Sequence, residues 1–227
     1  MTNHPEHENW HREAVAGRRW EVDQVWDRVG KRQRDFMVEM GMLPEHFVLD
    51  VGCGALRAGV HLIDYLEPGH YYGIDKEEAL IKAGVDQEMP RYGVADIPVN
   101  LHVVSDFSLD HIPSDIQFDF AMAHSIFTHI VPELIERCLS NVVPRLSRDG
   151  TFFATFHLSK DGEVDLSEEL PEFQSWRKGE RYLTQYPISL FEEICGRLGF
   201  DVKYVGGWGH PLNYRNRQMM LSFSRKD

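Results

Sequence analysis

Apolar and polar positions follow two different periods along this chain. Between residues 19 and 40 the apolar side chains recur mostly three or four positions apart, which is the period of an amphipathic helix. From Phe47 onward, short apolar runs alternate with helical stretches, which indicates parallel strands joined by crossover helices. The pattern therefore predicts an N-terminal helical arm over residues 1–40, interpreted as a lid, followed by one α/β domain over residues 41–227.

Seven strands and four helices are expected in this domain. The strands are predicted at residues 47–52, 70–75, 99–107, 118–124, 151–158, 201–206 and 218–224, and the helices at 56–66, 77–87, 132–146 and 187–198. The loop before the last strand is too short for a crossover helix, so that strand is expected to run antiparallel. The predicted fold class is α/β, with a Rossmann-like, doubly wound, mostly parallel sheet. Residues 159–185, with weak periodicity and mixed charge, are interpreted as an insertion over the sheet's ligand-binding edge.

Composition and charge narrow the class of protein and of partner. The 227 residues are 42% hydrophobic and 26% charged, which is typical of a globular chain. The net charge of −12 repels phosphate backbones and anionic membrane surfaces, so we expect neither a nucleic acid nor a membrane as partner. The first twenty residues lack the apolar core of a signal peptide, which predicts a cytoplasmic protein. The three cysteines are odd in number and widely spaced, which predicts reduced thiols.

The stretch VLDVGCGALRAG, residues 48–59, is the most informative part of the chain. A buried strand is expected to end near Asp50, and Gly52 and Gly54 permit a tight turn whose backbone can approach a ligand. A helix is expected to begin directly after the turn, with its N–H groups facing the same point. A dinucleotide-binding turn would need a third glycine where Arg57 stands, which disfavours the alternative of an NAD(P)-dependent oxidoreductase.

An acidic residue closes the next predicted strand. Asp75 stands 25 positions after Asp50, close to the roughly 20 expected for a carboxylate that binds ribose hydroxyls. A carboxylate that accepts hydroxyl protons makes charge-assisted bonds, which are stronger than neutral ones. Together the glycine turn and Asp75 indicate an adenosine-containing ligand without a pyrophosphate.

Six segments in this order resemble the class I S-adenosylmethionine-dependent methyltransferases, over about residues 30–224: VLDVGCG, YYGIDKE, VVSDF, FDFAMAHSIFTHI, LSRDGTFFATF and PISLFEEICGRLGF. The resemblance implies S-adenosylmethionine as the cofactor. It also implies which residues bind each part of the cofactor. The methionine part is expected to contact the turn of Asp50, Gly52, Cys53 and Gly54 and the backbone groups of Ala123 and His124. The ribose is expected to contact Asp75 with Lys76, the adenine amino group Asp106 with Ser105, and an adenine ring nitrogen the Phe107 N–H.

Two more residues are hypothesised to bind the cofactor. The turn reads CGALRAG in place of the commoner CGxG pattern, which leaves the partner of the cofactor's carboxylate open. Arg57 is our hypothesis for this partner, although an arginine in a first helical turn often pairs with a neighbouring acid instead. From the arm, which is expected to close over the cofactor, Gln33 is predicted to reach it.

The acceptor is expected to be a small molecule, methylated on an oxygen of a sugar, polyketide or similar metabolite. The [DN]PP[YF] motif of enzymes that methylate nucleic-acid bases is absent, and no acid ends the fourth strand to bind a catalytic metal, so we predict metal-independent transfer. A hydroxyl acceptor needs a base, and histidine has a pKa of about 6.5. His129 and His157, at the carboxyl ends of the fourth and fifth predicted strands, are the candidates; either could instead be an ordinary loop histidine.

Three possibilities stay open at this stage. His210, with Trp208 and Tyr214 as a possible aromatic wall, is a weaker candidate for the acceptor site. The chain could also bind S-adenosylmethionine without turnover, because a fold does not determine a function. A monomer and a homodimer are equally compatible with the sequence.

Overall fold

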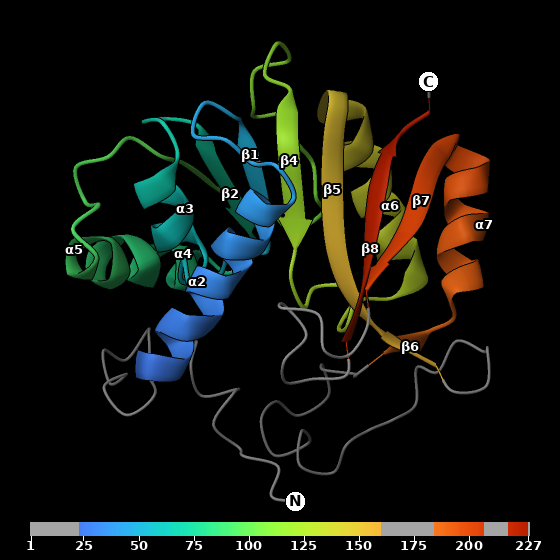
Figure 1. Cartoon of the computed structure of the whole chain (residues 1–227), viewed down its shortest axis with the longest axis horizontal. Coiled ribbons are helices and arrows are strands. Elements are labelled where there is room, and N and C mark those ends of the chain that lie inside the picture. Colours follow the sequence, from blue (N-terminus) through green and yellow to red (C-terminus); the bar gives the residue numbers. More distant parts are fainter. Residues whose placement is uncertain (1–22, 160–183, 207–217, 227) are drawn as a thin grey trace, which may run out of the picture. The chain divides into compact units, whose positions relative to one another are not determined.

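The structure is a computed structural model that describes residues 23–159, 184–206 and 218–226 (Figure 1). Residues 1–22 of the predicted arm, residues 160–183 of the predicted insertion, and the loop that carries Trp208, His210 and Tyr214 lie outside the described residues. The chain divides into two compact parts, residues 1–105 and residues 106–227. Each part has its own strands and helices.

The first part contains three parallel strands. Their order is β3 (Asn100–Val103), β2 (Tyr71–Asp75) and β1 (Val48–Val51). All four residues of β1 are buried, as expected for a parallel strand that is covered on both faces. Val51 lies opposite Ile74, so the carboxyl ends of β1 and β2 leave the sheet side by side. The predicted strands of this part are confirmed.

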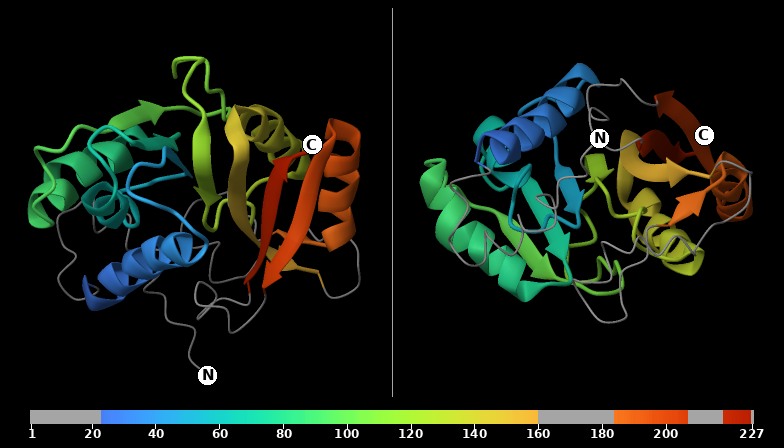
Figure 2. Two further views of the ribbon diagram at one scale, coloured as in Figure 1. Left: turned by 45° about the horizontal axis from the view of Figure 1, so that its top comes forward. Right: turned by 90° about the horizontal axis from the view of Figure 1, so that it is seen from below.

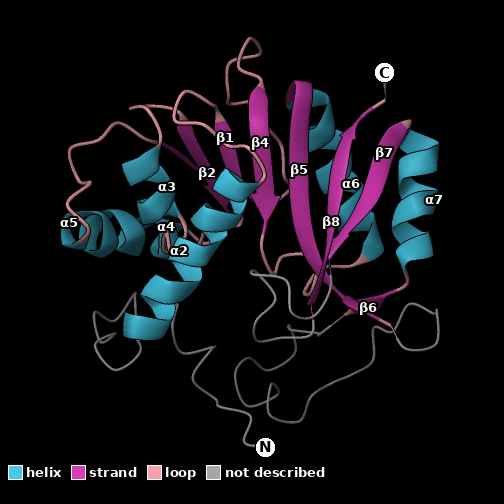
Figure 3. Cartoon of the chain, in the orientation of Figure 1, coloured by secondary structure: helices cyan, strands magenta, loops and turns pink. Residues whose placement is uncertain are grey.

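The described residues of this part contain five helical segments, and they are cyan in Figure 3. They are α2 (Asp23–Glu39), α3 (Gly59–Tyr65), α4 (Glu78–Ala83), the π-helical turn η1 (Gly84–Glu88) and α5 (Met89–Arg91). The predicted helical pattern of the arm is confirmed in α2, whose residues Trp26, Val29, Phe36 and Met37 are buried. The helix expected from residue 56 begins later, at Gly59, because Leu56 adopts a left-handed conformation with φ of 60°.

The second part contains the remaining strands: β4 (Phe118–Ala123), β5 (Leu146–Leu158), β6 (Gln185–Tyr186), β7 (Phe200–Gly206) and β8 (Gln218–Arg225). Their order is β4-β5-β8-β7, and β6 pairs with β5. β8 is antiparallel to both neighbours, as predicted from the short loop before it. β6 was not expected: the end of the predicted insertion is a short strand, and the described residues contain eight strands instead of seven. The predicted α/β fold class is otherwise confirmed.

The helices of the second part are α6 (Pro132–Val142), the short 3-10 helix η2 (Val143–Arg145) and α7 (Ile188–Leu198). α6 opens with a proline, which has no N–H to satisfy. α7 ends at Gly199, whose φ of 73° suits a residue without a side chain. α7 contacts β7 and lies along it in Figure 2.

A cluster of phenylalanines forms the core of the second part. Phe127, Phe152, Phe156, Phe191 and Phe223 are all fully buried. The rings of Phe127 and Phe191 stack 6.2 Å apart, and those of Phe156 and Phe191 lie 4.7 Å apart. Phe127 belongs to the loop after β4, so this cluster anchors that loop to the strands and to α7.

The three cysteines, Cys53, Cys138 and Cys195, are buried and free, which agrees with the prediction of reduced thiols. Within the described residues, no helix combines the length and the apolar character needed to cross a membrane.

Candidate cofactor site

The loop after β1 is built on left-handed backbone conformations. Gly52 and Gly54 have φ of 76° and 54°, and Leu56 has φ of 60°. The N–H groups of Gly52 and Cys53 both donate to the carbonyl of Ile74 at the end of β2, at 2.7 and 3.1 Å. The loop therefore folds back over the end of the neighbouring strand instead of continuing as a helix.

Asp75 joins this loop to the end of β2. The Gly54 N–H donates to Oδ2 at 2.9 Å and the Glu77 N–H donates to Oδ1 at 2.9 Å. Burial raises the pKa of Asp75, and the two backbone hydrogen bonds oppose this by lowering it. The carboxylate is thus held in one orientation, and each of its oxygens keeps a lone pair for a further donor.

Asp50 is placed differently. It is 3% exposed, and its Oδ2 accepts a hydrogen bond of 2.9 Å from the Tyr71 hydroxyl. Burial raises the pKa of Asp50 to about 7, with the Tyr71 hydrogen bond lowering it and Asp75 raising it. Asp50 therefore sits behind the loop as a buried partner of Tyr71.

Helix α2 packs closely on the same loop. A Cβ on Gly30 would lie 1.9 Å from the carbonyl oxygen of Arg57, so only a glycine permits this approach. The Arg57 guanidinium lies over the Trp26 ring, 5.6 Å from its centroid, which is a cation–π geometry. Beside them the Nε2 of His61 lies 3.4 Å from the Oδ1 of Asp27 of α2. Helix α2 is thereby joined to the loop after β1 and to α3.

Gln33 lies one turn after Gly30 in this packed helix. It is 2% exposed, and its Nε2 has no hydrogen-bonding partner among the residues that the structure describes. A buried amide donor without a partner costs about 1 to 3 kcal/mol. Such a group in a native structure calls for an explanation, and an absent ligand atom is one of the recognised ones.

The other residues predicted to bind the cofactor in this part have simpler environments. Cys53 is buried, and burial raises its pKa well above the usual range. Its Sγ lies 3.0 Å from the position that a Cβ on Gly73 would occupy, so β2 needs a glycine there. Lys76 and Ser105 are exposed.

In the second part, Asp106 and Phe107 begin the connection to β4. The Asp106 Oδ1 accepts a hydrogen bond of 3.1 Å from the Ser108 N–H. Phe107 has φ of 62°, which is unusual for a bulky residue and persists only where the surroundings enforce it. The Asn141 side chain of α6 adds a bond of 3.5 Å to the Asp106 carbonyl.

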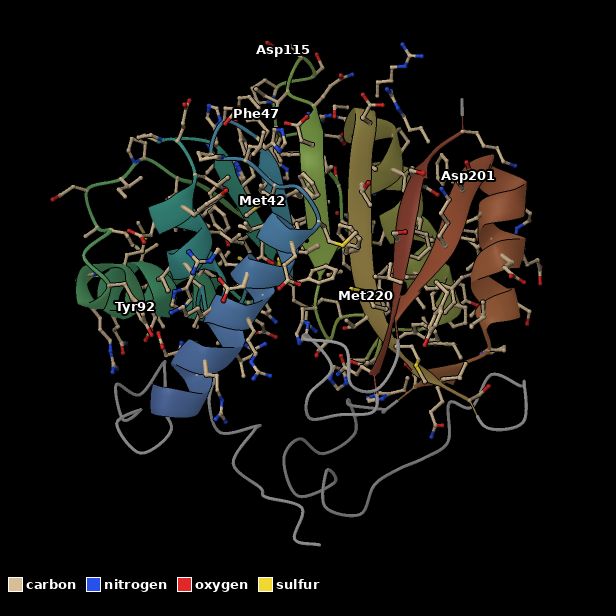
Figure 4. The ribbon with its side chains drawn as sticks, in the orientation of Figure 1. Met42, Phe47, Tyr92, Asp115, Asp201 and Met220 are labelled. Atoms are coloured by element: carbon tan, nitrogen blue, oxygen red, sulfur yellow. The ribbon has the colours of Figure 1, made fainter. Side chains whose placement is uncertain are left out.

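Arg145 of η2 holds the rest of this connection. Its guanidinium donates to the carbonyls of Leu109, Ile112, Pro113 and Ile116, at 2.6 to 3.5 Å. Asp115, labelled in Figure 4, lies at the outer end of this loop. One side chain thus fixes two successive turns. Sequence patterns could not predict this role, because the partners are main-chain carbonyls.

The exit of β4 is a polar junction within an apolar sheet. Ala123 is buried and His124 half-buried, and Ser125 follows with φ of 61°. The Ser125 N–H donates to Thr155 Oγ1 at 2.7 Å, and the Gln218 Nε2 donates to Ser125 Oγ at 2.9 Å. Sequence reasoning missed this network; its only signal was the presence of Ser125, Thr155 and Gln218 in otherwise apolar segments.

The loop that carries His129 is tied to β6. The Thr184 N–H donates to the Thr128 carbonyl at 3.0 Å, and the Tyr186 hydroxyl donates to the Ile130 carbonyl. His129 itself is exposed, and its N–H donates to the Ile126 carbonyl at 3.0 Å. Since β6 pairs with the end of β5, His157 is anchored to the same frame.

The two candidate bases differ in environment. His157 is half-buried, and burial lowers its pKa to about 4. Its imidazole is therefore neutral at pH 7 and a weak base. His129 is exposed to solvent, where no comparable burial acts on it.

Similarity to known proteins bears on this site. A family model described as a methyltransferase domain matches residues 49–152, which include both the glycine loop and Asp75. The chain is also 22% identical to an uncharacterized protein of Methanocaldococcus jannaschii over 158 residues. This region is 69% of the present chain but only 40% of that relative, so the chain spans less than half of the relative's length.

Two solved structures have a similar fold. Magnesium protoporphyrin IX methyltransferase from Synechocystis, with S-adenosylhomocysteine bound, gives a TM-score of 0.62 at 19% identity, over 89% of this chain and 87% of that one. The 1,6-didemethyltoxoflavin-N1-methyltransferase of Burkholderia thailandensis also gives a TM-score of 0.62, at 16% identity, over 97% of this chain and 87% of that one. At these identities the likeness establishes the fold. Residues 49–152, a little under half of the chain, are similar to the methyltransferase domain that the family model describes.

Proposed function

We propose that this protein transfers the methyl group of S-adenosylmethionine to a small-molecule acceptor, at an oxygen of a sugar, polyketide or similar metabolite. The observation that carries the proposal is the way Asp75 is held. Its two oxygens are oriented by the N–H groups of Gly54 and Glu77, each at 2.9 Å, beside the glycine loop after β1. Two fixed acceptors at the end of β2 suit the two adjacent hydroxyls of a ribose.

Gln33 supports the same assignment from an independent direction. Its buried Nε2 lacks a partner, and Gln33 stands on the helix that packs against the loop of Arg57. The carboxylate of the cofactor's methionine part would accept a hydrogen bond from this amide. We therefore assign Gln33, and not Arg57, as the residue that binds this carboxylate; the Arg57 guanidinium is directed to the Trp26 ring.

Within the second part, Asp106 and the Phe107 N–H are proposed to bind the adenine, and backbone groups of Ala123 and His124 the methionine part. The side chain of Arg145 holds the loop that follows Asp106, which limits its motion. The strained backbone of Phe107 supports a binding role, because such conformations cluster at ligand sites.

His129 is the proposed general base. When bound, S-adenosylmethionine supplies a methyl group that is already electrophilic, so the protein's task is to position the acceptor and remove its proton. Imidazole is suited to this work at neutral pH, and His129 is exposed to solvent. His157 is a poorer base, because its pKa of about 4 leaves little driving force for proton uptake.

Isothermal titration with S-adenosylhomocysteine tests the cofactor assignment. Asp75→Asn keeps one carbonyl oxygen but removes the charge, and we expect affinity to fall by about 1.5 to 3 kcal/mol, or roughly 10- to 150-fold. Asp64→Asn, on the exposed side of α3, is the matched control and should bind as the wild type does. Undiminished affinity in Asp75→Asn would refute the ribose assignment.

Two further measurements separate the competing functions. Thermal stabilisation by NADH but not by S-adenosylhomocysteine would favour an oxidoreductase. Incubation with a metabolite extract tests turnover, since a methylated product gains about 14 mass units. Tight binding of S-adenosylhomocysteine without any such product would indicate a binding protein without catalysis.

A further inference from the structure

Two polar side chains lie at the end of β5, and one of them is buried without a hydrogen-bonding partner among the described residues. Ser159 is 8% exposed, and its Oγ makes no hydrogen bond. His157 lies two residues earlier, on the same side of the extended chain. Its imidazole is half-buried. Native proteins satisfy nearly all buried polar groups, so the unpaired Ser159 hydroxyl beside this imidazole points to a ligand.

The residues beside this pair are polar but uncharged. His157 lies opposite Gln218 of β8 and opposite Gln185 of β6, so the three side chains form a row across three strands. Gln218 is occupied by its bond to Ser125. The Ser159 N–H donates to the Tyr186 carbonyl at 3.1 Å, which fixes Ser159 against β6.

The charge at this place disfavours an anion. Burial holds the pKa of His157 at about 4, so at pH 7 the ring is neutral and offers one donor and one acceptor. The residues in register with His157 are the uncharged Gln185 and Gln218. A ligand with a negative charge would therefore meet no cation from the row.

We propose that His157 and Ser159 form the subsite that binds the methyl acceptor, and that this acceptor is an uncharged molecule with hydrogen-bonding groups at both ends of a ring-sized body. The inference rests on the proposed function. The ring-sized spacing follows from the strand, because residues two apart are separated by about 6.6 Å. In this role His157 orients the acceptor, and proton removal is left to His129, whose loop is tied to the same strand β6.

A pair of probes that differ only in charge tests the subsite. The protein is saturated with S-adenosylhomocysteine and titrated by calorimetry with 4-hydroxybenzamide or with 4-hydroxybenzoate. We expect the amide to bind at least about tenfold more tightly than the benzoate, a difference of 1.4 kcal/mol. His157→Leu and Ser159→Ala should each weaken amide binding, by roughly five- to tenfold for one hydrogen bond. His157→Gln keeps a neutral donor and acceptor and should stay within about threefold of the wild type.

Ser224→Ala, at the far end of β8, is the control and should change nothing. A melting curve for each variant identifies any that fails to fold. If His157→Leu does not fold, Ser159→Ala still tests the subsite, because it removes only a single oxygen. Equal binding of the two probes, no binding of the amide, or unchanged binding in Ser159→Ala would each overturn the inference. If S-adenosylhomocysteine binds while the amide does not, the proposed function survives and the subsite falls. Failure of S-adenosylhomocysteine to bind refutes the proposed function first.

Discussion

Replacement of the buried Gln33 by leucine should change stability and binding in opposite directions. Leucine has a similar size but no polar atoms, so Gln33→Leu removes an amide whose Nε2 is buried without a partner. The ligand-free protein should become more stable. The same change should weaken the binding of a ligand whose carboxylate would have satisfied that amide.

The magnitudes follow from the cost of an unpaired donor. Removal of an unsatisfied buried amide should return about 1 to 3 kcal/mol of unfolding free energy. For a chain of this size each kcal/mol raises Tm by about 2 to 4 °C, so an increase of at least a few degrees is expected. Loss of a hydrogen bond to a charged carboxylate should weaken the binding of S-adenosylhomocysteine by about 1.5 to 3 kcal/mol, which is a roughly 10- to 150-fold increase in Kd.

Calorimetric titration with two ligands isolates this contact. S-adenosylhomocysteine carries the amino acid moiety, whereas 5′-methylthioadenosine lacks it, so Gln33→Leu should bind the second ligand as the wild type does. Glu39→Gln, on the exposed end of α2, serves as control for the helix. Equal losses for both ligands would mean that the variant displaces α2 as a whole. Unchanged affinity for S-adenosylhomocysteine, or a destabilised apoprotein, would refute the reasoning.

Four other variants test separate features. Gly30→Ala places a methyl group 1.9 Å from the Arg57 carbonyl oxygen, so urea denaturation should show that the free energy of unfolding falls by about 1 to 3 kcal/mol or more. In Gly196→Ala, a control in α7, the new methyl group meets no atom within 4 Å, and the free energy of unfolding should rise by about 0.5 to 1 kcal/mol. Burial lowers the pKa of His157 from 6.5 to about 4. Between pH 6.5 and pH 4 the unfolded chain therefore binds more protons than the folded one, so the free energy of unfolding decreases as the pH falls through this interval. Between pH 7.5 and 5 the wild type should therefore lose about 2 kcal/mol more than His157→Gln, and equal losses would contradict the buried neutral ring. His129→Gln should reduce kcat by roughly 100-fold or more while S-adenosylhomocysteine binds normally; an unchanged kcat would exclude it as the base.

Local patterns were sufficient to predict most of the elements. The buried run at 48–51 and the proline that opens α6 carry their own signals, because strand burial and helix capping depend on neighbours in the sequence. The antiparallel last strand followed from a short loop, which is also a local feature. The glycine loop and Asp75 were recognised for the same reason.

Features that depend on distant contacts were not predicted. The late start of α3 arises from the left-handed backbone of Leu56, which neighbouring strands and helices impose and no propensity indicates. Strand β6 exists only because β5 offers it an edge. The carbonyl ligands of Arg145 and the polar junction at Ser125 likewise involve groups about 30 or more positions apart.

The sequence alone determined the order of strands and helices, the glycine loop and the acid that follows it, because periodicity and spacing report on local backbone geometry. Only the tertiary structure decided what each side chain can do. It paired Asp50 with Tyr71, left the amide of Gln33 without a partner, and gave His157 a low pKa. These properties are set by burial and by neighbours that the chain brings together only when it folds.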